Sequence, residues 1–371
     1  MLPLAVVGAV LIAAFPPSQS KMTRAPLAAL GPRAHLAALG PRGVQLHPLW
    51  DGESVATFDR ELDTVRAAGG DTVRIDIGWS NLEQAGKGAY DDASAAKADT
   101  FLRDARARGI KVIATLWSTP CWASSAPADI KQGCRGHWWE RGVDRYPPND
   151  ARDYADAAAW VAARWGSQLQ ALELWNEPNS RSFFNSAHAA SDYAALVRTA
   201  YPRIKAADQG LTVVAGSLQW ADARFLGALY AAGLAGSYDA ISIHPYDDPG
   251  EHASPGDATY SFADGVPAIH RLMVAHSDAR TPLWLTEFGW ATCPSSRSAL
   301  CVSPRQQAQN LTDAFHQIAR WPYVQTAIYY ELRDEGASSP DFQQHLGLLS
   351  TDFTPKAAYA AFAGQPNPPA A

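Results

Sequence analysis

The chain has 371 residues and a net charge of −6 at pH 7. Hydrophobic residues make up 47% of it and charged residues 18%, which excludes global disorder and allows two average domains or one large barrel. The acidic balance argues against a nucleic-acid-binding protein that works through a basic surface. The chain also contains 13 Trp and only four Cys, so aromatic side chains are abundant and thiols are scarce.

An apolar run opens the chain at residues 2–15. It is shorter than the roughly 20 residues that a membrane-spanning helix needs. It matches the core of a secretory signal peptide, with Ser18 and Ser20 in a small-x-small cleavage pattern. No basic residue precedes the run, so an uncleaved membrane anchor and a buried N-terminal segment stay open as alternatives. We therefore predict a signal peptide or anchor over residues 1–20 and a secreted or extracytoplasmic protein that contacts a membrane only through an uncleaved anchor.

Residues 21–42 contain the repeat Leu-Ala-Ala-Leu-Gly-Pro-Arg twice and are predicted to be a linker. Beyond it, short β-branched or apolar runs alternate with Ala-rich stretches of helical periodicity. The predicted strands are residues 44–47, 72–77, 111–116, 169–174, 212–216, 240–244, 283–286 and 326–330. The predicted helices are residues 58–68, 95–108, 151–165, 192–207, 223–233, 266–276, 304–319 and 355–362.

Eight β-α repeats in one chain predict an α/β fold, a single (β/α)8 TIM barrel over residues 43–363. A doubly wound sheet is the main alternative, but no GxGxxG motif follows the first predicted strand. Residues 364–371 are rich in Pro and Ala and are predicted to form a disordered tail. The length therefore corresponds to one barrel, and we expect a monomer.

The four cysteines form two close pairs, Cys121 with Cys134 and Cys293 with Cys301. Each pair brackets a polar stretch that is typical of a loop, so two local disulfides are the simplest interpretation and agree with export. Zinc ligation is an alternative, although no CxxC or HxxxH spacing is present, and four separate buried thiols are another. We predict no metal and no cofactor.

Two glutamates follow predicted strands at the rim where a TIM barrel carries its active site. The fourth strand leads into Trp-Asn-Glu-Pro-Asn at residues 175–179, which places Asn176 and Glu177 there. The seventh leads into Thr-Glu-Phe-Gly-Trp at residues 286–290, which places Glu287 there. Glycoside hydrolysis needs such a pair, one carboxylic acid to protonate the leaving oxygen and one carboxylate to attack or to activate water. Structural ion pairs are the alternative.

These two motifs resemble the signatures of the retaining glycosidases of glycoside hydrolase clan A, in particular family 39-like and family 5 cellulase-like members. The resemblance covers residues 43–363. It implies that Glu177 is the general acid/base and that Glu287 is the nucleophile. It also implies supporting roles at Asn176 (the sugar 2-hydroxyl), Arg74 (holding the nucleophile), His244 and Tyr246 (a His-x-Tyr motif after the sixth strand), and Trp117 and Trp122 (the loop after the third strand).

Nine of the 13 Trp fall at predicted strand ends or in the loops that follow. Trp faces pack on the C–H groups of sugar rings, and Trp290 and Trp122 are the preferred candidates for sugar platforms. The family often has Trp near the end of the eighth strand, where this chain has Tyr329 and Tyr330. Tyr330 is therefore a candidate for substrate binding, and Glu331 is a weak rival for catalysis. An ion pair with Asp76 is the alternative role for Arg74, Glu173 is expected to be a buried structural partner, and Glu83 is expected to be solvated.

The sequence thus predicts a secreted retaining O-glycoside hydrolase that cleaves β-linked poly- or oligosaccharide by double displacement, with carbohydrate as its partner and no nucleic acid. A non-catalytic glycan-binding protein on a glycosidase scaffold is the alternative. A metal-dependent barrel hydrolase that uses His47, His137 and His244 is a further alternative, but their neighbours show no metal-ligand spacing.

Overall fold

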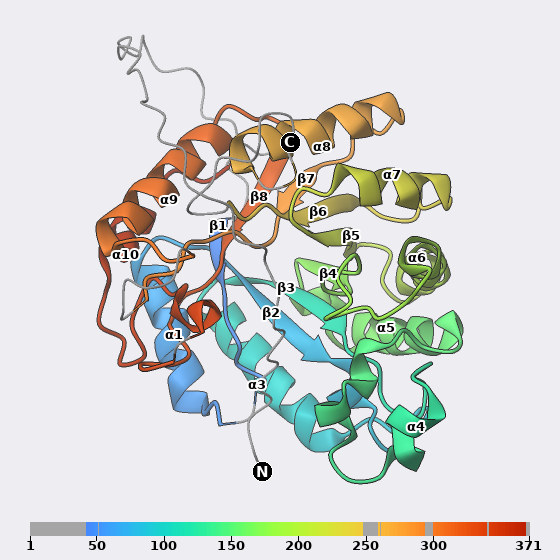
Figure 1. The fold of residues 1–371 in the computed structure, drawn as a ribbon. Helices are drawn as coiled ribbons and strands as arrows, with labels where there is room; N and C mark the ends of the chain where they lie inside the picture. Colours follow the sequence, from blue (N-terminus) through green and yellow to red (C-terminus); the bar gives the residue numbers. More distant parts are fainter. Residues whose placement is uncertain are drawn as a thin grey trace.

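Eight parallel strands close into a barrel in the order in which they occur in the chain, because β1 pairs with both β2 and β8. The computed structural model describes residues 42–50, 52–247, 259, 261–293, 300–339 and 341–368. The predicted signal or anchor segment and residues 21–41 lie outside them. The strands are β1 (Arg42–Gln45), β2 (Thr72–Gly78), β3 (Lys111–Trp117), β4 (Ala171–Leu174), β5 (Thr212–Gln219), β6 (Ala240–His244), β7 (Leu283–Leu285) and β8 (Val324–Tyr329). The predicted TIM barrel is confirmed (Figure 1).

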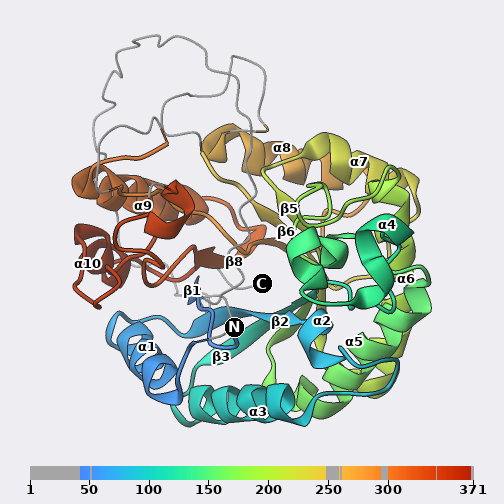
Figure 2. The ribbon, with the colours of Figure 1, turned by 60° about the horizontal axis from the view of Figure 1, so that its bottom comes forward.

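The main helices surround the barrel (Figure 2). They are α1 (Val55–Ala67), α3 (Asp92–Ala107), α5 (Ala151–Trp165), α6 (Ala189–Ala207), α7 (Ala223–Ala231), α8 (Phe262–Ala275), α9 (Pro304–Ile318) and α10 (Ala357–Ala363). Short helices add α2 (Trp79–Leu82), α4 (Ala128–Lys131), η1 (Gln132–Cys134), η2 (Trp138–Arg141), η3 (Val143–Arg145), η4 (Gly166–Gln168) and η6 (Phe342–His345). Across the described ranges, no helix has the length and apolar character to cross a bilayer.

Side-chain caps explain why two helices begin before their predicted starts. Helix α1 begins at Val55 because the Ser54 side chain accepts a hydrogen bond from the backbone N–H of Thr57. Helix α3 begins at Asp92 because Asp91 caps it in the same way. The amphipathic pattern marks the residues that face the core, whereas the caps set the first turn.

The core has two parts, as expected of a barrel whose strand side chains alternate in direction. A large cluster lies between strands and helices and includes Phe58, Phe101 and Trp165. A smaller cluster takes one residue from each of β3 to β8: Ile113, Ala171, Val214, Ala240, Trp284 and Ile328. This inner layer fills the barrel, so the functional face is confined to the strand ends.

A bulge in β5 shapes the rim. Its pairing with β6 shifts register between Ala215 and Leu218. Gly216 lies there at φ 108°, and a Cβ atom on it would come within 2.4 Å of the Ser242 carbonyl oxygen, so the position requires glycine. The next residue, Ser217, adopts a left-handed φ of 48°. The bulge carries β5 on to Gln219, three residues past its predicted end.

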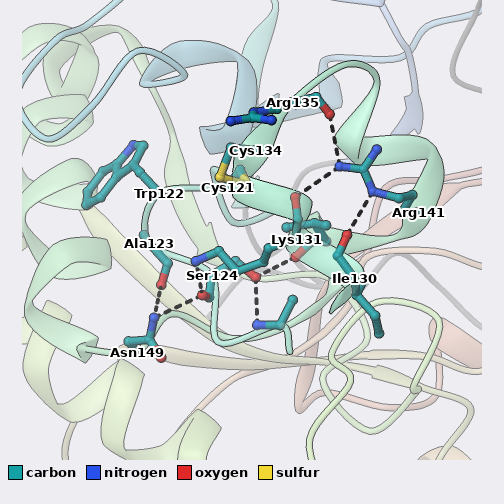
Figure 3. Close-up of a disulfide and its surroundings, with 12 residues drawn as sticks. Cys121, Trp122, Ala123, Ser124, Ile130, Lys131, Cys134, Arg135, Arg141 and Asn149 are labelled. Atoms are coloured by element: carbon teal, nitrogen blue, oxygen red, sulfur yellow. Dashed lines mark hydrogen bonds between the residues drawn. A yellow bond between two sulfur atoms is a disulfide. The ribbon is translucent and has the colours of Figure 1, made fainter. Parts of the chain in front are cut away.

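The long loop after β3 is held together by the disulfide between Cys121 and Cys134 (Figure 3). The Arg141 guanidinium donates to three backbone carbonyl oxygens of this loop, those of Ile130, Lys131 and Arg135. The Asn149 amide donates to the Ala123 and Ser124 carbonyls. The second predicted disulfide, Cys293–Cys301, is also formed. Both cysteine pairs are therefore structural staples rather than zinc ligands or free thiols.

The structure corrects both predicted ends of the barrel domain. Arg42, predicted as the last linker residue, is a buried residue of β1. Its guanidinium donates to the carbonyl oxygens of Phe362 and Gln365, and the Asn367 amide donates to Asp71 Oδ2 over 3.0 Å. The beginning of the predicted disordered tail is therefore anchored against the N-terminal end of the barrel.

Candidate active site

Glu177 and Glu287 lie close together at the carboxyl ends of β4 and β7. One carboxylate oxygen of each and a ring nitrogen of His244 all lie within 4.8 Å of one another. All three side chains are buried. Two carboxylates held this close in a buried site cannot both be ionised at little cost, so their surroundings decide which one carries the charge.

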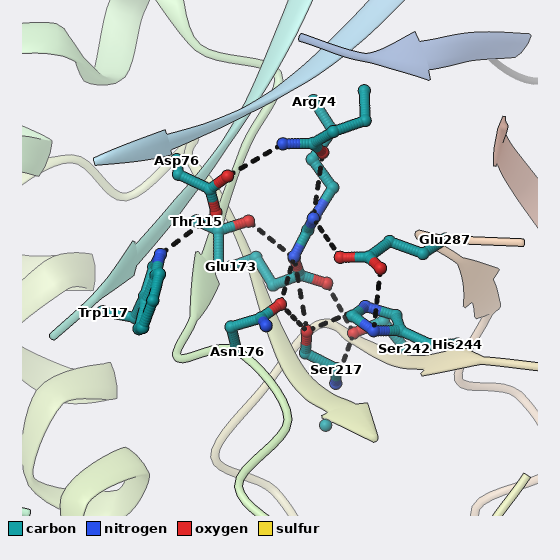
Figure 4. Close-up of polar contacts among 12 residues, drawn as sticks. Arg74, Asp76, Thr115, Trp117, Glu173, Asn176, Ser217, Ser242, His244 and Glu287 are labelled. Carbon is teal, nitrogen blue, oxygen red and sulfur yellow. Dashed lines mark hydrogen bonds and ion pairs between the residues drawn. The ribbon is translucent and has the colours of Figure 1, made fainter. Parts of the chain in front are cut away.

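Arg74, on β2, joins the main polar groups of the site (Figure 4). Its guanidinium donates to Glu287 Oε1 over 2.7 Å, to Glu173 Oε2 over 2.6 Å and to Asn176 Oδ1 over 2.9 Å. Its side chain is 1% exposed. The alternative ion pair of Arg74 with Asp76 is not formed, because Asp76 instead accepts from Gln45 and Trp117. The structure thus places Arg74 where it orients Glu287 and stabilises its negative charge.

Glu173 lies beneath the site and is fully buried, as expected of a structural partner. Besides Arg74, it accepts hydrogen bonds from Thr115 Oγ1 over 2.8 Å and Ser242 Oγ over 2.7 Å. A buried ion pair is tolerated only when such hydrogen bonds satisfy the remaining lone pairs. Glu173 therefore orients the Arg74 guanidinium, whose other N–H groups donate to Glu287 and Asn176.

The surroundings of Glu287 favour its anion more than those of Glu177 do. Burial raises the pKa of Glu287 to about 7, while Arg74 and the Tyr246 hydroxyl act in the opposite direction. That hydroxyl donates to Glu287 Oε2 over 2.8 Å. Two charge-stabilising donors on one carboxylate are the arrangement that a nucleophile needs, since only the ionised form attacks.

The protonated form is favoured more strongly at Glu177. Burial raises its pKa well above the usual range, and the negative charge of Glu287 adds to the increase. Desolvation is the larger of these two causes. The Gln219 amide donates to Glu177 Oε2 over 2.9 Å, and His244 Nδ1 lies 3.0 Å from Oε1. The surroundings of Glu177 thus favour its protonated form, which a general acid needs.

His244 and Asn176 complete the site. Burial lowers the pKa of His244 well below its ordinary value, so its imidazole is neutral, and its Nε2 lies 3.1 Å from Ser217 Oγ. Asn176 accepts from Arg74 through Oδ1, which fixes the orientation of its amide. Its Nδ2 makes no hydrogen bond to any of the described residues, so this donor is available to a ligand.

Two residues of β5, Ser217 and Gln219, contact the site but are absent from the sequence prediction. The signal is present, because a polar residue at the end of a strand is a site candidate. The sequence prediction omits these two residues because it ends β5 at residue 216. The bulge that extends the strand leaves no periodic pattern in the sequence. Gln45, on β1, is also absent from the prediction; its Oε1 accepts from Arg74 over 2.9 Å.

The burial of Trp290 argues against the predicted sugar platform there. Trp290 is only 4% exposed and belongs to the hydrophobic core, where its ring meets Phe288 edge-on at 6.4 Å between centroids. Trp122 is half-buried and donates through Nε1 to the Glu83 carbonyl oxygen over 2.7 Å, so it anchors its loop. Glu83, expected to be solvated, is itself buried and accepts from Trp79 Nε1. Trp117 is half-buried beside Asp76 and stays a candidate for substrate contact.

Tyr330 and Glu331 lie on the β1 side of the site. The Tyr330 ring lies edge-on to Tyr246 at 6.5 Å and to His47 at 5.8 Å. Glu331 Oε2 lies 3.3 Å from His47 Nε2. Its contacts are therefore with His47 rather than with the Glu177–Glu287 pair, which does not support a catalytic role for Glu331.

The three histidines considered as metal ligands do not meet. His47 belongs to a group with Glu331 and Glu335, and His244 belongs to the group with Glu177 and Glu287. His137 lies on the loop after β3, where it contacts Glu140. The predicted trio is therefore not a site.

Comparison with known proteins agrees with this arrangement. The family model of cellulase (glycosyl hydrolase family 5) matches residues 34–321. A family 39 glycoside hydrolase from the gut symbiont Bacteroides cellulosilyticus WH2 has a similar structure, with a TM-score of 0.68 and 21% identity over 87% of this chain and 63% of that one. A monomeric β-xylosidase from Caulobacter crescentus CB15 is similar with a TM-score of 0.63 and 20% identity over 88% of this chain and 69% of the other.

The exo-β-1,4-mannosidase Op5Man5 from Opitutaceae bacterium strain TAV5 is also similar, with a TM-score of 0.61 and 16% identity over 88% of this chain and 59% of that one. This chain thus spans less than two thirds of the length of both the Bacteroides and the Opitutaceae proteins. At these identities the structural likeness establishes the fold. No curated protein matches the chain.

Proposed function

Because this chain belongs to the cellulase family, glycosyl hydrolase family 5, we propose that it hydrolyses β-linked poly- or oligosaccharide with retention of anomeric configuration. In this proposal Glu177 is the general acid/base and Glu287 the nucleophile. The family membership confirms the clan A glycosidase that the two strand-end motifs predicted. The observation that carries the proposal is the pair of buried carboxylates, of which Glu287 accepts hydrogen bonds from Arg74 and the Tyr246 hydroxyl.

The separation of the two carboxylates supports a double displacement. Oxygen atoms of Glu177 and Glu287 lie within 4.8 Å of each other. Retaining enzymes hold the two groups about 5–5.5 Å apart, whereas inverting enzymes need about 6.5–9.5 Å to admit a water molecule. Direct attack by one carboxylate fits the shorter distance.

In the first step Glu287 attacks the anomeric carbon, and the bond to the leaving oxygen breaks as Glu177 protonates that oxygen. Arg74 and Tyr246 donate to Glu287 and stabilise the ionised form that attacks. The resulting ester has no charge on Glu287, so the pKa of Glu177 falls. In the second step the Glu177 carboxylate takes a proton from water as the water oxygen bonds to the anomeric carbon, and the ester bond breaks to release Glu287 as a carboxylate. The free Nδ2 of Asn176 is placed to bind the sugar 2-hydroxyl.

The location and organisation of the protein are part of the same proposal. The two disulfides and the apolar N-terminal run support an extracytoplasmic protein. A single barrel domain that acts as a monomer is supported by the monomeric β-xylosidase of Caulobacter crescentus. A non-catalytic glycan-binding protein is disfavoured because both carboxylates are present in a hydrogen-bonded arrangement that binding alone does not require.

A substrate panel tests the proposal. Wild-type protein, Glu177→Ala and Glu287→Ala are incubated with β-linked polysaccharides and aryl β-glycosides, and the anomer released first is identified by NMR. Glu140→Ala, which removes an exposed carboxylate outside the site, is the matched control. We expect the wild type and the control to release the β-anomer first and Glu287→Ala to be inactive. An inactive wild type, a fully active Glu287→Ala or initial release of the α-anomer would contradict the proposal.

A further inference from the structure

A cavity of about 320 Å³ opens between the carboxyl ends of β1 and β8. Its lining includes His47, Trp50, Glu331 and Glu335. It adjoins the candidate active site, because the Tyr330 ring contacts His47 on one side and Tyr246 on the other. Its volume is within the range of small-ligand sites, about 300–1,000 Å³.

The cavity lies on the glycone side of the catalytic pair. In a closed eight-stranded barrel, β8 and β1 are opposite β4 and β5, which carry Glu177 and Gln219 (Figure 1). The leaving group of a glycosidase lies beside its general acid, here Glu177. In the proposed mechanism, a cavity on the opposite side is therefore on the side of the glycone, the part of the substrate that becomes bonded to Glu287.

Acidic side chains outnumber basic ones in this cavity, and burial together with the neighbouring Glu335 raises the pKa of Glu331 to about 8. Five carboxylates and two cationic side chains line it: Glu53, Glu61, Glu331, Asp334 and Glu335 with His47 and Arg333. Arg333 is occupied by Glu53 and Glu61, and Asp334 is paired with Lys356 over 2.7 Å. Only His47 is left among these lining residues to neutralise both Glu331 and Glu335.

Those two carboxylates lack good hydrogen bonds. His47 Nε2 lies 3.3 Å from Glu331 Oε2 and 3.6 Å from Glu335 Oε1, and neither contact has hydrogen-bond geometry. Glu331 Oε1 has no hydrogen-bond partner among the described residues although the side chain is only 3% exposed. A buried carboxylate oxygen without a donor carries a desolvation cost that a ligand donor would remove.

We propose that this cavity binds the ammonium group of a cationic amino sugar, with the carboxylates of Glu331 and Glu335 as its acceptors. The inference rests on the proposed glycosidase function and adds the class of sugar on its glycone side. An ammonium group supplies three hydrogen-bond donors and one positive charge. Among the described residues of the cavity, Glu331 and Glu335 lack both good donors and a second cation beside them.

An amino sugar fits the cavity better than a bare metal ion does. Burial lowers the pKa of His47, but its contacts with Asp76 and Glu331 outweigh this effect and raise the pKa well above the ordinary value. The resulting imidazolium has no lone pair for a metal. Trp50 is 39% exposed and stacks on the His47 ring at 3.8 Å, so a partly exposed aromatic surface is available to a sugar ring.

Three tetrasaccharides with the same ring and linkage test the inference. They are β-1,4-linked tetramers of glucosamine, N-acetylglucosamine and glucose, which differ only at C2. Binding is measured by calorimetry with Glu177→Gln, which suppresses turnover and preserves the neutral state of that side chain. We expect the glucosamine tetramer to bind about tenfold more tightly than the other two, since a charge-assisted contact exceeds a neutral one by about this factor.

Adding Glu335→Gln, an isosteric change at a side chain that is 28% exposed, should remove the difference between the tetramers. Adding Glu140→Gln, which removes an exposed charge elsewhere, should preserve it. Equal affinities, no binding by any tetramer, or a loss in Glu335→Gln that is the same for all three would overturn the inference. Saturable binding of Zn²⁺ alone that depends on Glu335 would overturn it in favour of a metal site. The proposed glycosidase function is tested separately, by measuring whether the wild type hydrolyses neutral β-glycosides.

Discussion

Replacing Tyr246 with Phe removes one of the two donors on the proposed nucleophile and preserves the aromatic ring. The lost hydrogen bond runs from the Tyr246 hydroxyl to Glu287 Oε2 over 2.8 Å, and the partner carboxylate is buried. A hydrogen bond to a charged group contributes about 1.5–3 kcal/mol, and about 1.4 kcal/mol corresponds to one pKa unit. The substitution should therefore raise the pKa of Glu287 by about one to two units.

The assay is the pH dependence of kcat/KM on an aryl β-glycoside. Glu287 attacks as an anion, so activity is lost as the pH falls through its pKa, and a raised pKa moves the acidic limb of the profile to higher pH. At a pH below the pKa of Glu287 in both proteins, kcat/KM should fall about tenfold for each pH unit by which the limb moves. Tyr201→Phe is the control, because its hydroxyl bonds Asp239 away from the site. An acidic limb that stays in place in Tyr246→Phe, with kcat/KM unchanged, would refute the reasoning.

Substitutions at three further positions test other parts of the structure. Gln219→Leu removes a donor that stabilises the Glu177 carboxylate, so the alkaline limb of kcat/KM should move up by about one pH unit; a downward movement would contradict this. Glu173→Ala removes one of the two buried carboxylates that pair with Arg74 and should lower the free energy of unfolding in urea by about 3–5 kcal/mol; a loss below about 1 kcal/mol would show that Glu173 is dispensable. Trp290→Ala should lower the free energy of unfolding by about 3–5 kcal/mol. Trp290→Phe should retain kcat/KM within about twofold. A larger loss of kcat/KM in Trp290→Phe at unchanged stability would support Trp290 as a sugar platform.

Local patterns determined the architecture. The alternation of strand and helix periodicity predicted eight repeats, and all eight strands and the eight main helices are present within a few residues of their expected positions. The two strand-end motifs located Glu177 and Glu287, because a TIM barrel brings the carboxyl ends of its strands to one face whatever the details of packing. The cysteine spacing likewise predicted both disulfides, since each pair closes a short local loop.

Contacts between distant segments decided the rest. Arg74 pairs with Glu287 rather than Asp76 because closure of the whole barrel brings the ends of β2 and β7 around one site, and no spacing along the chain encodes this pairing. Burial of Trp290 depends on Phe288 and the surrounding core, so its residue type and position alone suggested a platform that packing removes. The bulge of β5 and the group of His47, Glu331 and Glu335 arise where separate strands meet. The sequence by itself thus determined which residues reach the rim, and the tertiary structure decided which of them meet, because charge, burial and hydrogen bonding at the rim are set by neighbours from other strands.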